Sequence, residues 1–406
     1  MQDWNIQASN LQGSNMYRAL YDLILKFSML LVAYTWIAYP LVLAALRWSA
    51  RRALGGRASF PSAAAGDHNA TMPSVSIIIP AHNEESRIAE KLRNCLEFEY
   101  PRDHLEFIVC SDGSTDATKE IALDFIARDA RIRWLQSQRR AGKSGVQNIA
   151  AAAARGDILF FTDANARMSP GILRVLIDAL ADPAVGLVTG TVHLGEPEDA
   201  VARGQGFYWR YELFLRVAES DLGILATASG QAMAVRRELY RPLPHCYGDD
   251  CILPLDVRMQ GHRVVQKRSA IVFDTMPHSI QGELRTRIRM TARNWAGTLA
   301  RPALLNPLRF PLTAWGLVSH KLLRWLTPFF LGFAFLSNTL LALGGNGRFL
   351  WCMQSGFYLS ALAGWRLTRK QRPAGLFGYS FSFCLANVGF LLGMLKALRR
   401  QKIIAY

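Results

Sequence analysis

Between residues 75 and 295 the chain repeats one pattern, in which a short apolar run ends in a polar loop rich in Asp, Asn, Gly and Ser. The loops are Pro80–Glu85, Ser111–Asp116, Thr162–Asn165 and Gly248–Asp250. Segments with helical spacing separate the runs, and this alternation predicts a doubly wound, mostly parallel α/β sheet. Ligands of such sheets bind beyond the carboxyl ends of the strands. The pattern therefore predicts one site that several loops build together.

The expected strands are short runs rich in β-branched and aromatic residues, at 75–79, 105–110, 132–135, 157–162, 185–192, 230–235 and 263–266. The apolar periodicity predicts helices at 84–98, 115–128, 143–155, 170–182, 207–219, 250–260 and 283–299. The last of these helices is strongly basic.

Apolar runs flank this stretch on both sides. The run Leu23–Trp48 exceeds the roughly 20 residues that a helix needs to cross a bilayer. Arginines cluster directly after it, at Arg47, Arg51, Arg52 and Arg57. The positive-inside rule then places the following domain in the cytoplasm. We therefore expect a multi-pass protein of the inner or plasma membrane with a cytoplasmic catalytic domain.

The C-terminal runs leave two arrangements open. Residues 304–324 contain two prolines and several basic residues, and they predict an interfacial amphipathic helix. Residues 326–343, 349–365 and 376–398 are span candidates, and basic residues follow the second and third of them. If all three cross, the basic C-terminal tail lies outside, against the positive-inside rule. Two or three spans therefore both remain.

The resulting domain plan has five parts. It consists of an N-terminal segment with one span (1–52), a linker (53–72), an α/β domain (73–300), an interfacial helix (301–325) and a C-terminal membrane region (326–406).

Composition narrows the class of partner. The chain has 47 Lys and Arg against 31 Asp and Glu, a net charge of +16, which suits a nucleic-acid binder, a membrane protein or an enzyme for anionic substrates. The sequence has no zinc-finger spacing and no repeated basic–aromatic pattern, so nucleic acid is not expected. The six cysteines show no C-x-x-C spacing, which favours reduced thiols over a metal site.

Taken singly, each polar loop is also a plausible turn or helix start. Together and in this order, over about residues 73–300, they resemble the family 2 glycosyltransferases. The resemblance implies the GT-A fold, a Rossmann-like fold of nucleotide-diphospho-sugar transferases. The flanking apolar runs resemble the membrane-integrated branch, which includes hyaluronan, chitin, poly-N-acetylglucosamine and cellulose synthases.

The resemblance implies a donor site with a nucleotide-diphospho-sugar, most plainly a UDP-sugar, and Mg²⁺ or Mn²⁺ as cofactor. Asp112 matches the acid that binds the nucleotide base, and Lys143 matches a basic loop near the diphosphate. The D-x-D motif corresponds to Asp163-Ala164-Asn165, in which Asn replaces the second Asp and Asp163 and Asn165 would hold the metal. The nucleotide-cradling loop corresponds to Pro80, Ala81, His82, Asn83 and Glu84.

On the acceptor side, Asp250 matches the general base of an inverting transfer, and Asp249 replaces the usual Glu before it. Ser229, Gly230 and Gln231 resemble the loop below the two sugars. The family's Q-x-x-R-W motif aligns with residues 286–290, which retain only Arg289; in another register the arginine is Arg293 and the aromatic residue is Trp295. The simpler interpretations are a helix cap for Asp250, a solvated lysine for Lys143 and a membrane-surface helix for the arginines.

These observations predict a membrane-bound, metal-dependent, inverting hexosyltransferase that acts on a lipid-linked or polysaccharide acceptor in exopolysaccharide or glycolipid synthesis. The incomplete Q-x-x-R-W motif disfavours long processive synthesis, although a processive synthase that extrudes its polymer remains the alternative. A non-catalytic membrane scaffold and a nucleotidyltransferase are the alternatives of other classes. An export partner or a homo-oligomer remains open.

Overall fold

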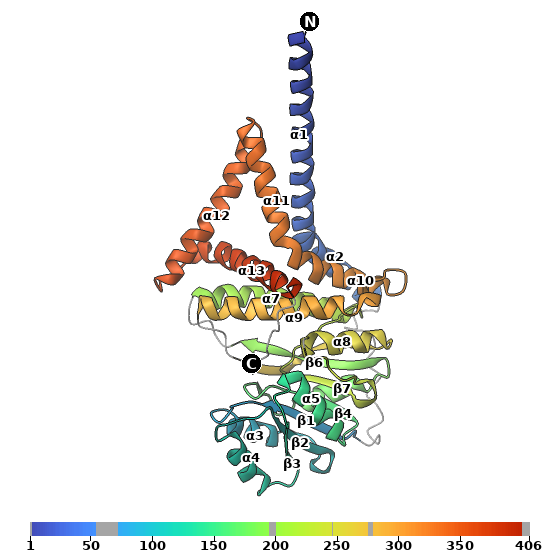
Figure 1. Cartoon of the computed structure of the whole chain (residues 1–406). Helices are drawn as coiled ribbons and strands as arrows, with labels where there is room; N and C mark the ends of the chain where they lie inside the picture. The colour runs from blue at the N-terminus through green and yellow to red at the C-terminus, as the bar shows by residue number, and fades with distance from the viewer. Residues whose placement is uncertain (1, 54–71, 195–199, 246, 275–278, 400–406) are drawn as a thin grey trace.

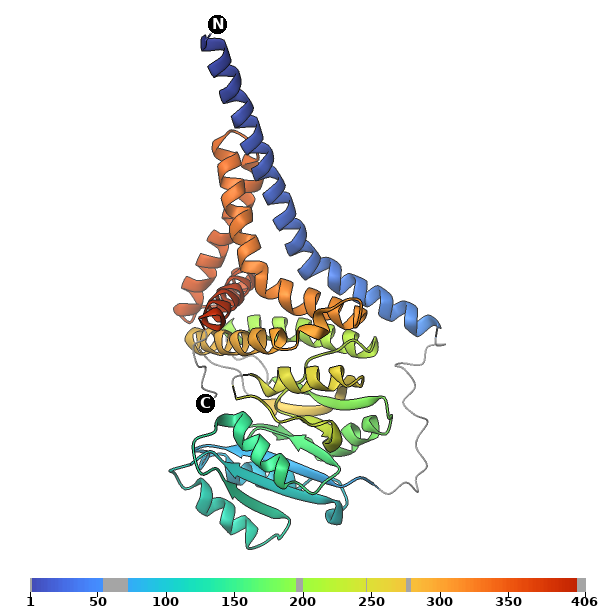
Figure 2. The same ribbon diagram turned by 45° about the vertical axis from the view of Figure 1, so that its right-hand side comes forward.

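The structure is a computed structural model that describes residues 2–53, 72–194, 200–245, 247–274 and 279–399 (Figure 1). The predicted linker at 53–72 lies almost entirely outside the described residues. A sheet domain forms one end of the molecule, and a group of long helices forms the other (Figures 1 and 2).

A single mixed sheet of eight strands organises the α/β domain, in the order β3-β2-β1-β4-β7-β6-β8-β5. The strands are β1 (Val75–Ala81), β2 (Leu105–Ser111), β3 (Ile132–Gln136), β4 (Ile158–Phe161), β5 (Arg167–Met168), β6 (Val185–Leu194), β7 (Met233–Arg236) and β8 (Arg263–Asp274). The half formed by β3, β2, β1 and β4 is parallel throughout. Strand β7 runs antiparallel to both β4 and β6, so the other half is mixed rather than mostly parallel.

All seven predicted strands are present, and β1 shows why they could be recognised. Its seven residues are all buried, as a strand covered on both faces requires, so it reads as a continuous apolar run. Strand β8 continues eight residues beyond the predicted end at 266, to Asp274, and this extension pairs with β6 on one side and with the two-residue edge strand β5 on the other. The sequence pattern did not predict β5.

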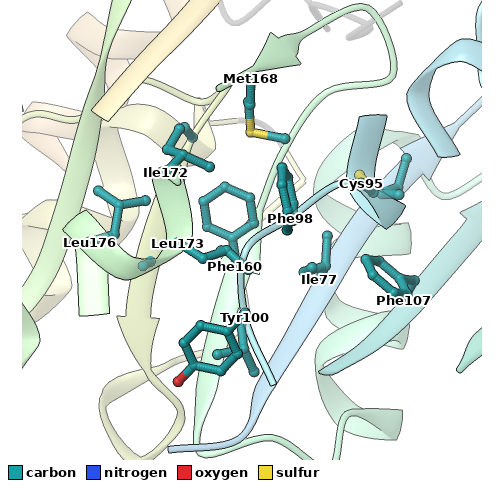
Figure 3. Close-up of a cluster of buried hydrophobic side chains, with 14 of the residues drawn as sticks. Ile77, Cys95, Phe98, Tyr100, Phe107, Phe160, Met168, Ile172, Leu173 and Leu176 are labelled. Carbon is teal, nitrogen blue, oxygen red and sulfur yellow. The ribbon is translucent and has the colours of Figure 1, made fainter. Parts of the chain in front are cut away.

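Helices cover both faces of this sheet. They are α3 (Ile88–Leu96), α4 (Thr118–Ile126), α5 (Gly142–Ala153), α6 (Ile172–Leu180) and α8 (Asp249–Met259). On one face, Ile77, Phe107 and Phe160 from three neighbouring strands pack against Cys95 of α3 and Leu173 of α6 (Figure 3). The other face packs against α5 and α8. Along the parallel half, the order in which strands are added reverses between β1 and β4. Sheets of this kind bind their ligands at the carboxyl ends of the two strands where this reversal occurs.

Two long helices, α7 (Ala200–Asp221) and α9 (Ile280–Leu299), lie between the sheet domain and the apolar helices (Figure 1). Helix α9 packs closely beneath the C-terminal helix α13. A Cβ atom added at Gly393 would lie 2.7 Å from Thr291 Cβ, and one added at Gly389 would lie 2.8 Å from Arg287 Cβ. Glycine at these two positions therefore permits the approach, and the basic helix is held between the two parts of the molecule.

The remaining helices are α1 (Gln2–Ala33), α2 (Tyr39–Ala53), α10 (Pro311–Gly316), α11 (Leu323–Leu343), α12 (Arg348–Arg369) and α13 (Gly375–Leu398). π-Helical turns at Tyr34–Ala38 and Leu317–Leu322 join α1 to α2 and α10 to α11. Within the described part of the chain, three continuous helices are long and apolar enough to cross a membrane: Asn15–Ala53, Pro311–Leu343 and Gly375–Leu398. Helix α12, a predicted span candidate, is not one of these three, and the interfacial position of residues 301–325 stays a prediction.

Candidate active site

The loops after β1 and β2 bind each other and form one rim of the site. Asn83 adopts a left-handed conformation with φ of 55°, which Asn tolerates better than most residues. Its side-chain oxygen accepts the backbone N–H of Thr115 at 2.9 Å, and its own N–H donates to Ser114 Oγ at 3.1 Å. The N–H of Glu84 donates to Thr118 Oγ1 at 2.8 Å. The polar residues of both predicted loops therefore fix one shared turn.

Asp112 directs the start of α5. Its buried carboxylate accepts the backbone N–H groups of Ala141 and Gly142 at 2.6 and 3.0 Å. Gly142 has a φ of 69°, a conformation that suits glycine, so the turn into the helix is tight. Both carboxylate oxygens of Asp112 are thus bound to the backbone immediately before Lys143, and this contact positions Lys143.

Lys143 is the central cation of the site. Its Nζ lies 2.7 Å from Asp163 Oδ1 and 2.9 Å from Asp249 Oδ2. Burial alone would lower the pKa of Lys143, but the two carboxylates outweigh it and raise that pKa above its usual range. One turn along α5, Gln147 Nε2 also donates to Asp249 Oδ2, at 2.8 Å. Lys143 is therefore bound by two carboxylates of the site and is not a solvated lysine at the start of a helix.

The adjacent acids Asp249 and Asp250 have opposite electrostatic environments. Burial raises the pKa of Asp249, but Lys143 and Gln147 outweigh it and lower that pKa to about 2. Burial and the charge of Asp249 raise the pKa of Asp250, with Arg293 acting against them. Paired carboxyl groups whose pKa values are pushed apart commonly divide the tasks of a fixed charge and a proton acceptor.

Gly248 explains how the Asp250 carboxylate reaches its place. A Cβ atom at position 248 would lie 2.4 Å from Asp250 Oδ1 and 2.8 Å from Asn294 Oδ1. Gly248 is also the N-cap residue of α8, so Asp250 lies inside the first turn rather than at the cap. The backbone carbonyl of Asp250 accepts the N–H of Ala228 at 2.9 Å, which attaches the acid pair to the loop before β7.

That loop carries Ser229, Gly230 and Gln231 over the same cluster. A Cβ atom at Gly230 would lie 3.4 Å from Lys143 Nζ and 3.5 Å from Asp249 Oδ2, so the backbone lies directly against the ion pair. Ser229 N–H donates to Thr189 Oγ1 at 2.9 Å, and the Gln231 amide donates to the carboxylate of Asp274. The loop is therefore held at both ends.

Helix α9 presents Arg293 to the acid pair. Arg293 is 9% exposed, donates to the carbonyl oxygen of Tyr247 and acts electrostatically on both Asp249 and Asp250. Arg289, one turn earlier, is exposed. Trp295 packs edge-on against Trp325 of α11 at 5.9 Å between ring centroids, and it borders an apolar cluster formed by residues of α11 and α13.

Asp163 and Asn165 follow β4 and carry oxygen atoms that suit Mg²⁺ or Mn²⁺. The Asn165 amide nitrogen donates to Asp274 Oδ1 at 3.3 Å, which leaves its carbonyl oxygen available, and only one oxygen of Asp163 pairs with Lys143. No cluster of three or more His, Cys, Asp or Glu side chains with metal-binding geometry occurs among the described residues. Mg²⁺ often binds through one or two carboxylates plus substrate phosphates, so this small donor set fits a cation that arrives with a phosphate ligand.

Residues 76–243 match the family model "Glycosyl transferase family 2". These residues form a family 2 glycosyltransferase domain. The mannosyltransferase PcManGT from Pyrobaculum calidifontis, solved with GDP-Man and Mn²⁺, is 25% identical with a TM-score of 0.69, and the match covers 93% of this chain and 99% of that chain. The GT-A fold is thereby confirmed. A likeness of this extent includes the apolar helices as well as the glycosyltransferase domain.

Two curated relatives indicate the range of the family. An N-acetylglucosaminyltransferase of Sinorhizobium fredii is 27% identical over 259 residues, which are 59% of this chain and 62% of that protein. A beta-monoglucosyldiacylglycerol synthase of a Nostoc species is 27% identical over 171 residues, which are 41% of this chain and 36% of that protein. The chain thus spans about three fifths or less of the length of these relatives.

The glycosyltransferase domain contains supporting residues that sequence reasoning missed. Lys91 of α3 is 2% exposed, and its Nζ donates to Thr162 Oγ1 at 2.7 Å and to the carbonyl oxygen of Ala166 at 2.6 Å. These contacts lie immediately before and after Asp163-Ala164-Asn165, so the buried ammonium holds both ends of that turn. Burial lowers the pKa of Lys91, with nearby Cys95 and Asp163 acting against it. The only sign of this role in the sequence is that Lys91 stands among the apolar residues of α3.

We expect Lys91→Met to destabilise the protein and to loosen this turn. The change fills similar space but leaves the Thr162 hydroxyl and the Ala166 carbonyl without their donor, at a cost of about 2–3 kcal/mol. Thermal unfolding of the full chain measures the loss, and binding of a nucleotide-sugar measures its effect on the site. Lys119→Met, at an exposed position of α4, is the matched control and should leave both unchanged. Equal stability of the two variants would show that Lys91 does not support the turn.

Proposed function

We propose that this chain is a membrane-bound, inverting glycosyltransferase that moves a sugar from a nucleoside-diphosphate donor to a lipid-linked or glycan acceptor. The observation that carries the proposal is the acid pair beside Lys143. Asp249 is held ionised by its ion pair with Lys143, whereas burial and the charge of Asp249 raise the pKa of Asp250. A carboxylate with raised basicity is suited to take a proton from a hydroxyl group.

On the donor side, Lys143 supplies positive charge for the diphosphate, and Asp163 and Asn165 hold a divalent cation. Arg293, buried next to the acid pair, is favoured over the exposed Arg289 for the diphosphate. The Mn²⁺ in the PcManGT complex supports the use of a metal. When bound, such a cation supplies a Lewis-acid contact to phosphate oxygens. The remaining donor contacts are assigned to the loop residues Pro80, Ala81, His82, Asn83, Glu84, Asp112 and Ala164.

The reaction follows from this arrangement. Asp250 accepts the proton of an acceptor hydroxyl while that oxygen attacks the anomeric carbon of the donor sugar. The bond from the anomeric carbon to the phosphate oxygen breaks, and the nucleoside diphosphate leaves with both electrons of that bond. One displacement inverts the configuration. The loop Ser229–Gln231, which lies against Lys143 and Asp249, is placed to bound the sugar sites.

Two further features support a membrane acceptor. Three described helices are long enough to cross a bilayer, and the relative from Nostoc is named for a glycolipid product. The catalytic domain faces the cytoplasm, where nucleotide-sugars are made. Trp295, the residue that could have stacked under an acceptor sugar, packs instead toward Trp325, which favours single additions over a processive synthase.

A donor screen with purified full-length protein in lipid nanodiscs tests the proposal. UDP- and GDP-linked hexoses and N-acetylhexosamines are supplied with extracted membranes as acceptor, with and without a chelator of divalent cations. We expect release of UDP or GDP that depends on the metal, and a product extended by one sugar. Release of pyrophosphate would identify a nucleotidyltransferase, long labelled polymer would identify a processive synthase, and no release with any donor would favour a scaffold.

The pH profile tests the role of the acid pair separately. Because burial and Asp249 raise the pKa of Asp250, the base is protonated at a higher pH than an ordinary Asp, whose pKa is about 3.9. We expect kcat/KM to fall about tenfold per pH unit below that raised pKa. Asp249→Asn removes the neighbouring negative charge, so the acid limb should move to lower pH. A limb at the same pH in both proteins would contradict the assignment of Asp250 as base.

A further inference from the structure

Helix α7 buries an arginine that has no carboxylate partner among the described residues. Arg216 is 7% exposed, and its Nε and Nη2 atoms have no hydrogen-bond acceptor in the described part of the chain. The glutamates on the same face of the helix are occupied elsewhere. Glu212 binds Lys321 at 2.9 Å, together with Arg324, and Glu219 accepts the hydroxyl of Tyr39 at 2.7 Å.

A buried guanidinium without a partner is costly, because arginine stays charged and the interior does not replace its hydration. Burial accordingly lowers the pKa of Arg216, and the glutamates and Asp250 only partly offset this effect. Replacing such a group by an apolar one is often neutral or stabilising. An arginine of this kind is therefore expected to bind an anion that is not part of the chain.

The position of Arg216 indicates which anion this is. Arg216 acts electrostatically on Asp250, so it lies near the proposed base, but it belongs to α7, between the sheet domain and the long helices (Figure 1). Glu212 and Glu219, which flank it on α7, bind the two longest apolar segments: Glu219 binds Tyr39 of the N-terminal helix, and Glu212 binds Lys321 and Arg324 of Pro311–Leu343. A ligand of Arg216 therefore approaches from the side of the membrane helices.

A second unsatisfied group lies on this same side. Thr227 Oγ1 is buried without a partner among the described residues, and it lines a small cavity with Glu219, His320 and Lys321. Thr227 directly precedes Ala228, whose N–H binds the carbonyl oxygen of Asp250. Thr227 therefore lies between the backbone that binds Asp250 and a cavity lined by residues of Pro311–Leu343. The donor diphosphate has its own cations in Lys143 and Arg293, so it does not account for these groups.

We propose that the acceptor is a lipid that carries a phosphate ester, and that Arg216 binds this phosphate on the membrane side of Asp250. The inference rests on the proposed glycosyl transfer and narrows its acceptor to an anionic lipid. The lipid chain lies toward the helices Asn15–Ala53 and Pro311–Leu343, the phosphate lies at Arg216, and the group that receives the sugar lies at Asp250.

Binding of a simple alkyl phosphate to the full-length protein in nanodiscs tests the site without requiring transfer. Dodecyl phosphate is compared with dodecanol, which has no charge, and with inorganic phosphate, which has no chain. We expect the wild type to bind dodecyl phosphate more tightly than either. Arg216→Gln should weaken this binding by about tenfold to a hundredfold, because one charged hydrogen-bonding partner is lost. Arg210→Gln, an exposed arginine of the same helix, should bind as the wild type does.

Two further measurements separate this site from the donor site and from folding. The affinity of Arg216→Gln for UDP and GDP should equal that of the wild type, and its melting temperature without ligand should be equal or higher. Unchanged dodecyl phosphate binding in Arg216→Gln, an equal loss of nucleotide affinity, or equal binding of inorganic phosphate by the wild type would each overturn the proposal. Failure of the wild type to release any nucleoside diphosphate would instead overturn the proposed glycosyl transfer.

Discussion

Asp250→Asn is expected to lower kcat by about 10²–10⁴-fold, the usual contribution of general acid–base catalysis, while the affinity for the donor stays the same. The amide has nearly the shape of the carboxylate but cannot accept the proton of the attacking hydroxyl. Lys143 and Asp163 are the residues proposed to contact the donor. They are paired with each other at 2.7 Å and not with Asp250. The loss should therefore appear in kcat and not in nucleotide binding.

Release of UDP or GDP measures the rate, and calorimetry with the nucleotide measures the affinity. Asp124→Asn, an exposed aspartate of α4, is the control and should leave both unchanged. Stability gives an independent signature. Asp250 is an acid whose pKa is raised by burial and by Asp249, so its replacement removes an unfavourable charge and should keep or raise the melting temperature at neutral pH. Full activity in Asp250→Asn would remove Asp250 as the base.

The parallel half of the sheet and its acidic loops were predictable because their signals are local. The buried strand β1 reads as an uninterrupted apolar run, and the turns at Asp112 and Asp163 follow such runs directly. Position beyond a strand end is enough to bring such loops to one edge of a parallel sheet. The roles assigned to these loop residues from the family resemblance remain predictions.

What could not be predicted depends on contacts between distant segments. Asp274 reaches the site because the extended part of β8 pairs with β6 and, next to Asp274, with the short strand β5, and no local pattern marks that extension. Lys91 lies in a helix that was predicted from its apolar face, and Arg216 lies in a helix whose sequence is marked mainly by its aromatic residues. The burial of Lys91 follows from the contact of α3 with the turn after β4, and the burial of Arg216 follows from the packing of α7 between the sheet domain and the long apolar helices. The choice between Arg289 and Arg293 likewise depended on tertiary packing, because these two residues lie one turn apart on α9 and only packing decides which turn lies beside the acid pair.

Lys143→Met is the second change with a large expected effect, and its consequence is electrostatic. Lys143 holds Asp249, which is 4% exposed, at a pKa of about 2. A carboxyl group whose folded pKa lies below its unfolded value of about 3.9 stabilises the protein above that unfolded value, and this contribution disappears as the pH falls through the folded pKa. For Asp249 the contribution is about 2–3 kcal/mol at neutral pH.

Without Lys143, Asp249 becomes a buried charge beside Asp250, and removing one partner of a buried pair typically costs about 3–5 kcal/mol. We expect a clear drop in the melting temperature at pH 7 that shrinks as the pH is lowered toward 3, where Asp249 of the variant is protonated. Urea unfolding at a series of pH values measures this difference. Lys119→Met is again the exposed control, and a drop that is independent of pH would indicate lost packing rather than a lost ion pair.

The double variant Lys143→Met/Asp249→Asn separates the two contributions of Lys143. Neutralising Asp249 removes the unpaired charge, so the double variant should recover most of the stability that Lys143→Met loses. It should not recover donor binding, because the cation proposed to face the diphosphate is still missing. Residues in direct contact show such coupling in a double-mutant cycle, typically about 0.5–3 kcal/mol. Recovery of stability together with recovery of donor affinity would mean that Lys143 serves the fold alone, and the diphosphate would then have to be bound through Arg293.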